Sequence, residues 1–229
     1  MARKSLFLVP VLTGLALPAA AQTALTLNAS GTAQAAPDEA VANFNAQAVM
    51  PDAASAQATV NQSVTNALTE AKNVPGVVVT TGGYNTYATT QDSQKPQYTA
   101  EQSFTLTQPA AGGVPDKAFT SLLAKLQADG LLLNGLSGGL SQAGQNKAQR
   151  AAIDDALVQL RTEADGIAAT LHKKVGALKT LNVDAGGGPT PPMPRMMMMA
   201  AAAPAPQSAP DKITVTANVS AVIELDGTP

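Results

Sequence analysis

The sequence of 229 residues contains no cysteine, no tryptophan and only one histidine. The absence of cysteine excludes disulfides, thiolate zinc sites, iron–sulfur clusters and cysteine nucleophiles. A single histidine excludes a histidine cluster that could bind a metal. Charged residues make up 13% of the chain and the formal net charge is −2. This balance excludes a basic nucleic-acid platform, because phosphate binding needs clustered lysine and arginine side chains.

Large side chains are scarce and small ones are abundant. The chain has four phenylalanines and three tyrosines, whereas alanine occurs 45 times. Alanine therefore supplies much of the 45% hydrophobic content. The length suffices for one core of about 150–200 residues, and we expect a single domain over residues 22–229.

The first 21 residues have the three regions of a secretory signal peptide. Arg3 and Lys4 supply the positive charge, residues 6–17 form the apolar region, and three alanines precede Gln22. The apolar region is shorter than the ~20 residues that a membrane span needs. We therefore expect residues 1–21 to be removed, and the mature chain to be periplasmic without membrane insertion.

Alternating apolar and polar residues predict two hairpins. Residues 25–30 and 40–49 alternate on either side of a turn and predict an antiparallel pair. Residues 77–87 and 98–108 predict a second pair. Shorter apolar runs that read as strands cover residues 131–140 and 178–184.

Apolar residues at helical spacing predict three helices. Asp52 or Ser55 caps the first, which runs to Lys72, and Pro115-Asp116 starts a short second helix. The third is predicted over residues 146–175, with Gly176 as its stop. Its apolar stripe comprises Ile153, Ala156, Leu157, Leu160, Ala164, Ile167, Ala168 and Leu171.

Residues 186–210 differ from the rest of the chain, with seven prolines, five methionines and three consecutive glycines. This proline density predicts a long loop, since neither a helix nor a strand tolerates it. Residues 213–225 then resume a clear alternation and predict a last strand. The expected fold class is α+β, a mostly antiparallel sheet with helices packed on one face and a long Pro/Met-rich loop before the last strand.

Several local phrases resemble the SIMPL-domain family of exported bacterial proteins related to YggE. They are Ala29-Ser30-Gly31-Thr32-Ala33 with Ala36-Pro37-Asp38-Glu39-Ala40, the helix near residues 151–171, and the Pro/Met/Ala segment that runs into Asp211-Lys212-Ile213-Thr214-Val215. The resemblance implies a periplasmic or surface-associated protein, in places linked to oxidative-stress tolerance, with some ring-forming members. It implies no enzymatic activity, no cofactor and no catalytic residues.

One motif resembles a hydrolase signature. Residues 135–139 read G-x-S-x-G around Ser137, and Asp154 or Asp155 and then His172 follow in the hydrolase order. In hydrolases the serine of this motif lies on a sharp turn from a strand directly into a helix, and this segment lacks such a turn. Asp154 and His172 would also lie ~27 Å apart along one helix. We therefore expect no enzyme here.

The remaining charged candidates have ordinary structural explanations. His172, with Lys173 and Lys174, is expected to cap the C-terminus of the long helix, where cations oppose the dipole. The acidic residues of this helix flank its apolar stripe and interleave with arginines, as on a solvated surface. They are Asp154, Asp155, Glu163 and Asp165.

The methionines of the Pro/Met segment are the candidate contact or soft-metal residues: Met193, Met196, Met197, Met198 and Met199. Methionine is an adaptable contact residue, so a docking surface is the leading interpretation. Thioethers also suit Cu(I), and they react reversibly with oxidants.

The sequence-based hypothesis is a non-enzymatic exported envelope protein that acts through self-assembly or protein contacts. A homo-oligomer is expected, with an envelope protein as a possible partner and no nucleic acid. The alternative is a periplasmic protein whose methionines bind Cu(I) or scavenge oxidants.

The export hypothesis predicts where the mature chain begins. Because a signal peptidase cleaves after small residues, the exported product should start at or near Gln22. N-terminal sequencing of the product and extraction without detergent check this prediction. A full-length product retained in the membrane would contradict it.

Overall fold

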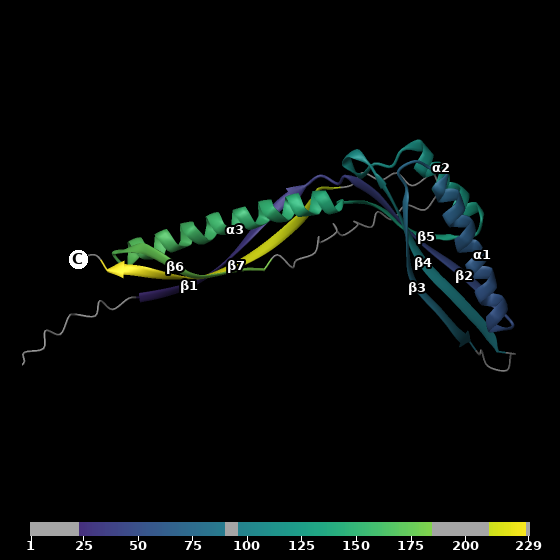
Figure 1. Cartoon of the computed structure of the whole chain (residues 1–229), viewed down its shortest axis with the longest axis horizontal. Coiled ribbons are helices and arrows are strands. Elements are labelled where there is room, and N and C mark those ends of the chain that lie inside the picture. The colour runs from purple at the N-terminus through teal and green to yellow at the C-terminus, as the bar shows by residue number, and fades with distance from the viewer. Residues whose placement is uncertain (1–22, 90–95, 185–210, 228–229) are drawn as a thin grey trace, which may run out of the picture.

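The computed structural model describes residues 23–89, 96–184 and 211–227. Figure 1 shows an elongated molecule in which two helix-covered sheets lie one after the other. The signal segment and residues 186–210, with all five candidate methionines, lie outside the described residues. The predictions made for those segments therefore stay predictions.

The described residues form seven strands, three α-helices and one short 3-10 turn. The strands are β1 (Thr23–Ala35), β2 (Glu39–Met50), β3 (Val78–Thr89), β4 (Gln97–Pro109), β5 (Leu132–Gly139), β6 (Lys173–Asp184) and β7 (Ile213–Gly227). The helices are α1 (Ala53–Lys72), α2 (Lys117–Ala128) and α3 (Gln142–Thr170), and the turn is η1 (Ala111–Gly113).

The α+β class is confirmed, but the strands form two antiparallel sheets instead of one. One sheet has the order β1-β7-β6 and the other has the order β3-β4-β2-β5. The second hairpin, β3 with β4, is confirmed. The last strand is also confirmed as β7, whose odd-numbered residues from Ile213 to Leu225 are buried.

The first predicted hairpin is wrong, because β1 and β2 belong to different sheets. Between them, the backbone of Asp38 bonds to the four-stranded half: its N–H donates to the Gly139 carbonyl and its carbonyl accepts from Ala110. The chain therefore crosses between sheets at this corner. β1 instead pairs with β7 over its full length, from Thr23 opposite Leu225 to Ala35 opposite Ile213.

Helices α1 and α2 cover one face of the four-stranded sheet (Figure 1). Asp52, one of the two candidates for the first cap, accepts from the backbone N–H of Ser55. Asp116, predicted at the start of the second helix, caps it by accepting from the backbone N–H of Phe119. The apolar side chains of both helices pack against a stacked pair of phenylalanines in the sheet, Phe44 and Phe104, whose ring centroids lie 5.4 Å apart. This half holds all the buried phenylalanines of the described chain.

Helix α3 covers the three-stranded sheet with an alanine face. The buried residues of α3 are Ala148, Ala152, Ala156, Leu160, Ala164 and Ala168. The larger members of the predicted stripe flank this face: Ile153, Leu157 and Ile167 are half-buried and Leu171 is exposed. Small side chains let the helix backbone approach the strands closely, which explains why so alanine-rich a sequence makes a core here.

The approach is closest at Gly31 in β1. A Cβ atom on this residue would lie 2.8 Å from Ala156 Cα, and closer still to Ala156 N and Ala152 O. Beside it, the Asp155 carboxylate on α3 accepts a hydrogen bond of 2.9 Å from the backbone N–H of Thr32. Only glycine fits this position, because the obstructing atoms are backbone and cannot move aside.

Both ends of α3 differ from the prediction of residues 146–175. The helix starts earlier because Ser141 caps it and the Asp38 carboxylate in turn accepts from the Ser141 hydroxyl at 2.7 Å. It ends earlier because His172 adopts a left-handed conformation with φ 52°. Lys173 then begins β6 instead of a last helical turn, so Gly176 is not the stop. Pairing with β7 outweighs the helical pattern of these residues.

The packing at Gly31 predicts a large cost for one added methyl group. Gly31→Ala should lower the free energy of unfolding by several kcal/mol, because β1 must move away from α3. Gly166→Ala is the matched control, since Gly166 lies in α3 with nothing within 4 Å of the added carbon. The control should stabilise by up to ~1 kcal/mol through helix propensity. Urea unfolding of both variants tests this, and equal stability would contradict it.

Candidate functional site

The flank of β6 is an uncovered apolar surface of the three-stranded sheet. Strand β6 lies at the edge of this sheet, and α3 packs more extensively on β1 and β7 than on β6. Four apolar residues of β6 pair with β7 residues that are buried under α3. The four β6 residues nevertheless remain exposed. We call them the β6 flank: Val175, Leu178, Leu181 and Val183.

The exposed fractions of paired residues on β6 and β7 differ greatly. Leu178 is 53% exposed, whereas its β7 partner Ile223 is 4% exposed. Leu181 is 43% exposed, and its partner Ala221 is 2% exposed. A single helix covers about two strands, so the third strand keeps its apolar side chains in water. An exposed apolar surface of this kind is typical of a contact site.

The backbone edge of β6 is protected against pairing over much of its length. The register with β7 shifts twice, between Val175 and Leu178 and between Leu178 and Thr180. Such bulges, and lysines such as Lys173 and Lys179, are the devices by which edge strands avoid joining other sheets. The flank therefore offers side chains for contact more readily than backbone hydrogen bonds.

A shallow hollow of about 460 Å³ marks the end of the flank near the C-terminus of α3. Arg161 and Asp165 form its helix wall, and their charged groups lie 3.9 Å apart. Lys173, Lys174 and the backbone near Gly176 form the strand wall. The apolar flank thus ends in a charged rim, which is the arrangement of a contact surface.

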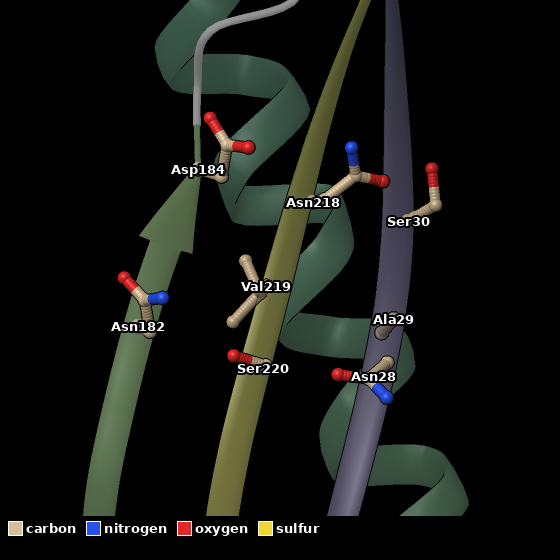
Figure 2. Close-up of a pocket in the computed structure, with 8 residues that line it drawn as sticks. All are labelled: Asn28, Ala29, Ser30, Asn182, Asp184, Asn218, Val219 and Ser220. Atoms are coloured by element: carbon tan, nitrogen blue, oxygen red, sulfur yellow. The ribbon is translucent and has the colours of Figure 1, made fainter.

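The opposite face of the same sheet is polar and has a second hollow, of about 410 Å³ (Figure 2). Its side chains come from all three strands and stand away from α3: Asn28, Ser30, Asn182, Asp184, Asn218 and Ser220. The three-stranded sheet therefore has the apolar β6 flank on one side and a polar face on the opposite side.

The residues of the G-x-S-x-G motif and its partners do not come together as a catalytic site. Ser137 lies within β5, opposite Val41 of β2, and no turn into a helix follows it directly. Asp155 bonds to the backbone of Thr32 on the other sheet, and His172 follows the far end of α3. The motif is thus a glycine-rich strand.

The corner at Asp38 and Glu39 has a structural role. Asp38 holds the start of α3 through Ser141, as described above. The pKa of Glu39 is raised, first by its burial and then by the neighbouring Asp38 carboxylate. Among the residues that the structure describes, no three His, Asp or Glu side chains are grouped to hold a metal ion.

The family of the chain follows from a comparison with family models. The model of the SIMPL family, described as a protein of unknown function (DUF541), matches residues 25–223. The chain belongs to the SIMPL family. The match spans strands of both sheets, from β1 to most of β7, and it supports the resemblance seen in the sequence. No curated protein matches this SIMPL chain.

The sequence predicted a strand at residues 178–184 but assigned Val175 to the long helix, so the β6 flank of this SIMPL protein was missed as a surface. A usable signal was present, since Leu181 and Val183 alternate with polar residues after Leu178. What the sequence could not supply is the position of α3 relative to β6.

No helix in the described part of the chain is both long and apolar enough to cross a bilayer.

Proposed function

We propose that this SIMPL protein is a non-enzymatic, exported envelope protein that acts by self-assembly. The observation that carries the proposal is the β6 flank, with Leu178 53% and Leu181 43% exposed beside buried partners on β7. The signal-like residues 1–21 support export to the envelope. A role in oxidative-stress tolerance is part of this proposal and rests on the family resemblance alone.

A second copy of the chain is the partner that best fits the flank. Most oligomers of soluble proteins are symmetric, and a two-fold contact places the same patch of each copy against the other. The flank is a short strip of branched aliphatic side chains, which is complementary to itself. Packing two flanks together would give each β6 the cover that α3 gives to β7. The bulged, lysine-bearing edge directs this contact to side chains.

The leucines of the flank contribute a measurable part of the free energy of such a contact. Full burial of a leucine side chain contributes about 1.5–3 kcal/mol relative to full exposure. Leu178 and Leu181 are each about half exposed, and two copies contribute four such leucines. The remaining burial is thus worth about 4 kcal/mol, or roughly a thousandfold in affinity.

Placing charge on the flank should dissociate the assembly. Leu178→Lys with Leu181→Lys should raise the dissociation constant by about a hundredfold or more, since four apolar contacts are lost. Sedimentation velocity over a concentration series measures this. The double variant should keep its melting temperature within a few degrees, because both side chains are exposed in the single chain.

Val78→Lys is the matched control for this experiment. Val78 is 58% exposed on edge strand β3 of the other sheet, so it tests added charge without touching the flank. The control should assemble like the unchanged chain. The proposal fails if the unchanged chain is a monomer at all concentrations, or if the control and the flank variant dissociate alike.

The alternative function rests on the methionines of residues 186–210. Met193 and Met196–Met199 offer five thioethers in a segment that the structure does not describe. Thioethers bind Cu(I), and their oxidation to sulfoxide is reversible. This alternative gives the protein a copper-binding or oxidant-scavenging role in the envelope.

Replacing Met196–Met199 by serine separates the two functions. If the methionines bind Cu(I), titration with a Cu(I) indicator should show weaker binding in the variant, while the native mass stays unchanged. If they take part in assembly, the native mass should fall instead. The melting temperature should stay within a few degrees in both cases, because we expect these residues to make no core contact. A variant that unfolds would place the methionines in the core and contradict both interpretations.

A further inference from the structure

The polar face of the three-stranded sheet carries two complete rows of hydrogen-bonding side chains. Asn28 of β1 lies opposite Ser220 of β7, which lies opposite Asn182 of β6. The next row along the strands is Ser30, Asn218 and Asp184. Figure 2 shows these side chains on three adjacent strands with α3 behind the sheet. The rows lie on the face opposite to the β6 flank.

Five of these six side chains keep their hydrogen-bonding capacity for a ligand. In the part of the chain that the structure describes, the side chains of Asn28, Ser30, Asn182, Asn218 and Ser220 make no hydrogen bond to another protein group. The other sheet behaves differently on its uncovered face, where the Thr105 hydroxyl donates to the Asn43 amide oxygen at 2.9 Å. Asn28, Ser30, Asn182, Asn218 and Ser220 are thus five unpaired groups at fixed spacing.

The mixture of groups selects a class of ligand. Each asparagine amide offers two donors and one acceptor, and each serine hydroxyl both donates and accepts. A phosphate mainly accepts hydrogen bonds and an ammonium group only donates them. Neither group can therefore use both the donors and the acceptors of such a row. A hydroxyl or acetamido group does both. The ligand that matches the rows is therefore rich in hydroxyls or amides.

Charge narrows the class further. No lysine or arginine side chain lines the hollow, so an anion would find no positive charge there. The nearest lysine of the same strand, Lys179, is already paired with Glu224 at 3.0 Å. No aromatic, methionine or leucine side chain lines the hollow, whereas the centre of a protein–protein contact is enriched in such residues. A neutral, hydrogen-bonding ligand fits better than an anion or a protein.

We propose that this face binds a neutral oligosaccharide. Adjacent strands lie ~4.8 Å apart, a separation comparable to the length of one sugar ring in an extended chain. A glycan that crosses the strands would place successive rings over β1, β7 and β6, within reach of one amide or hydroxyl from each row. The hollow over the two rows has a volume of about 410 Å³. Threonine pairs continue the polar face along β1 and β7, as at Thr32 opposite Thr216.

The test uses the mature chain and a neutral probe, the acetylated chitotriose, in isothermal titration calorimetry. Saturable binding is expected for this trisaccharide and none for inorganic phosphate at the same concentration. Asn218→Ala removes the central amide of one row and should weaken binding about tenfold. Asn43→Ala is the matched control, an exposed asparagine on the uncovered face of the other sheet, and should bind like the unchanged chain.

Thermal unfolding and native mass are measured for the same variants. Both asparagines are exposed, and Asn43→Ala loses only one exposed hydrogen bond, so both variants should unfold within a few degrees of the unchanged chain. The proposal is overturned by absent binding at millimolar trisaccharide, by equal affinity in Asn218→Ala and the unchanged chain, or by preferred binding of phosphate. It is also overturned if Asn218→Ala lowers the native mass without affecting any glycan, because the face would then be a contact between copies.

Discussion

The close contact between the alanine face of α3 and strand β1 is the constraint on which the three-stranded half depends. Gly31 lets β1 lie against the backbone of α3 at Ala152 and Ala156, and Asp155 fixes the strand by accepting from Thr32. A core of alanine and valine buries less area per residue than one of leucine and phenylalanine, so it needs this close approach to be dry. The four-stranded half, with its stacked Phe44 and Phe104, follows the more common solution.

A single helix on three strands leaves two different free surfaces, and the proposed functions follow from that arrangement. On the helix side, α3 leaves the β6 flank exposed, and apolar groups in water favour contact with another copy. On the other side, the sheet carries amides and hydroxyls in register, which favour a hydrated ligand. Because the two surfaces lie on opposite sides of the sheet, an assembled protein could still present its polar face.

Local signals in the sequence predicted local structure well. The helix starts near Asp52 and Asp116 and the alternation in β7 depend on neighbouring residues, and the structure confirms them. Which strands pair with each other does not depend on neighbouring residues alone. The alternation in β1 and β2 indicated two strands, but not that they join different sheets. The boundary of α3 failed because Ser141 depends on Asp38, a residue distant in sequence. The two polar rows could not be predicted, since they appear only when three strands are aligned in register.

The order of the strands has a consequence for how the chain folds. Every element from Glu39 to Gly139 belongs to the four-stranded half, so that half is complete within one continuous stretch. The three-stranded half takes β1 from the start and its central strand, β7, from the end, with Thr23 opposite Leu225. Contacts so distant in sequence form slowly, and here they wait until the last residues have emerged. Until then β1 and β6 have no neighbour, and their polar outer residues and the lysines of β6 protect the waiting edges from other chains.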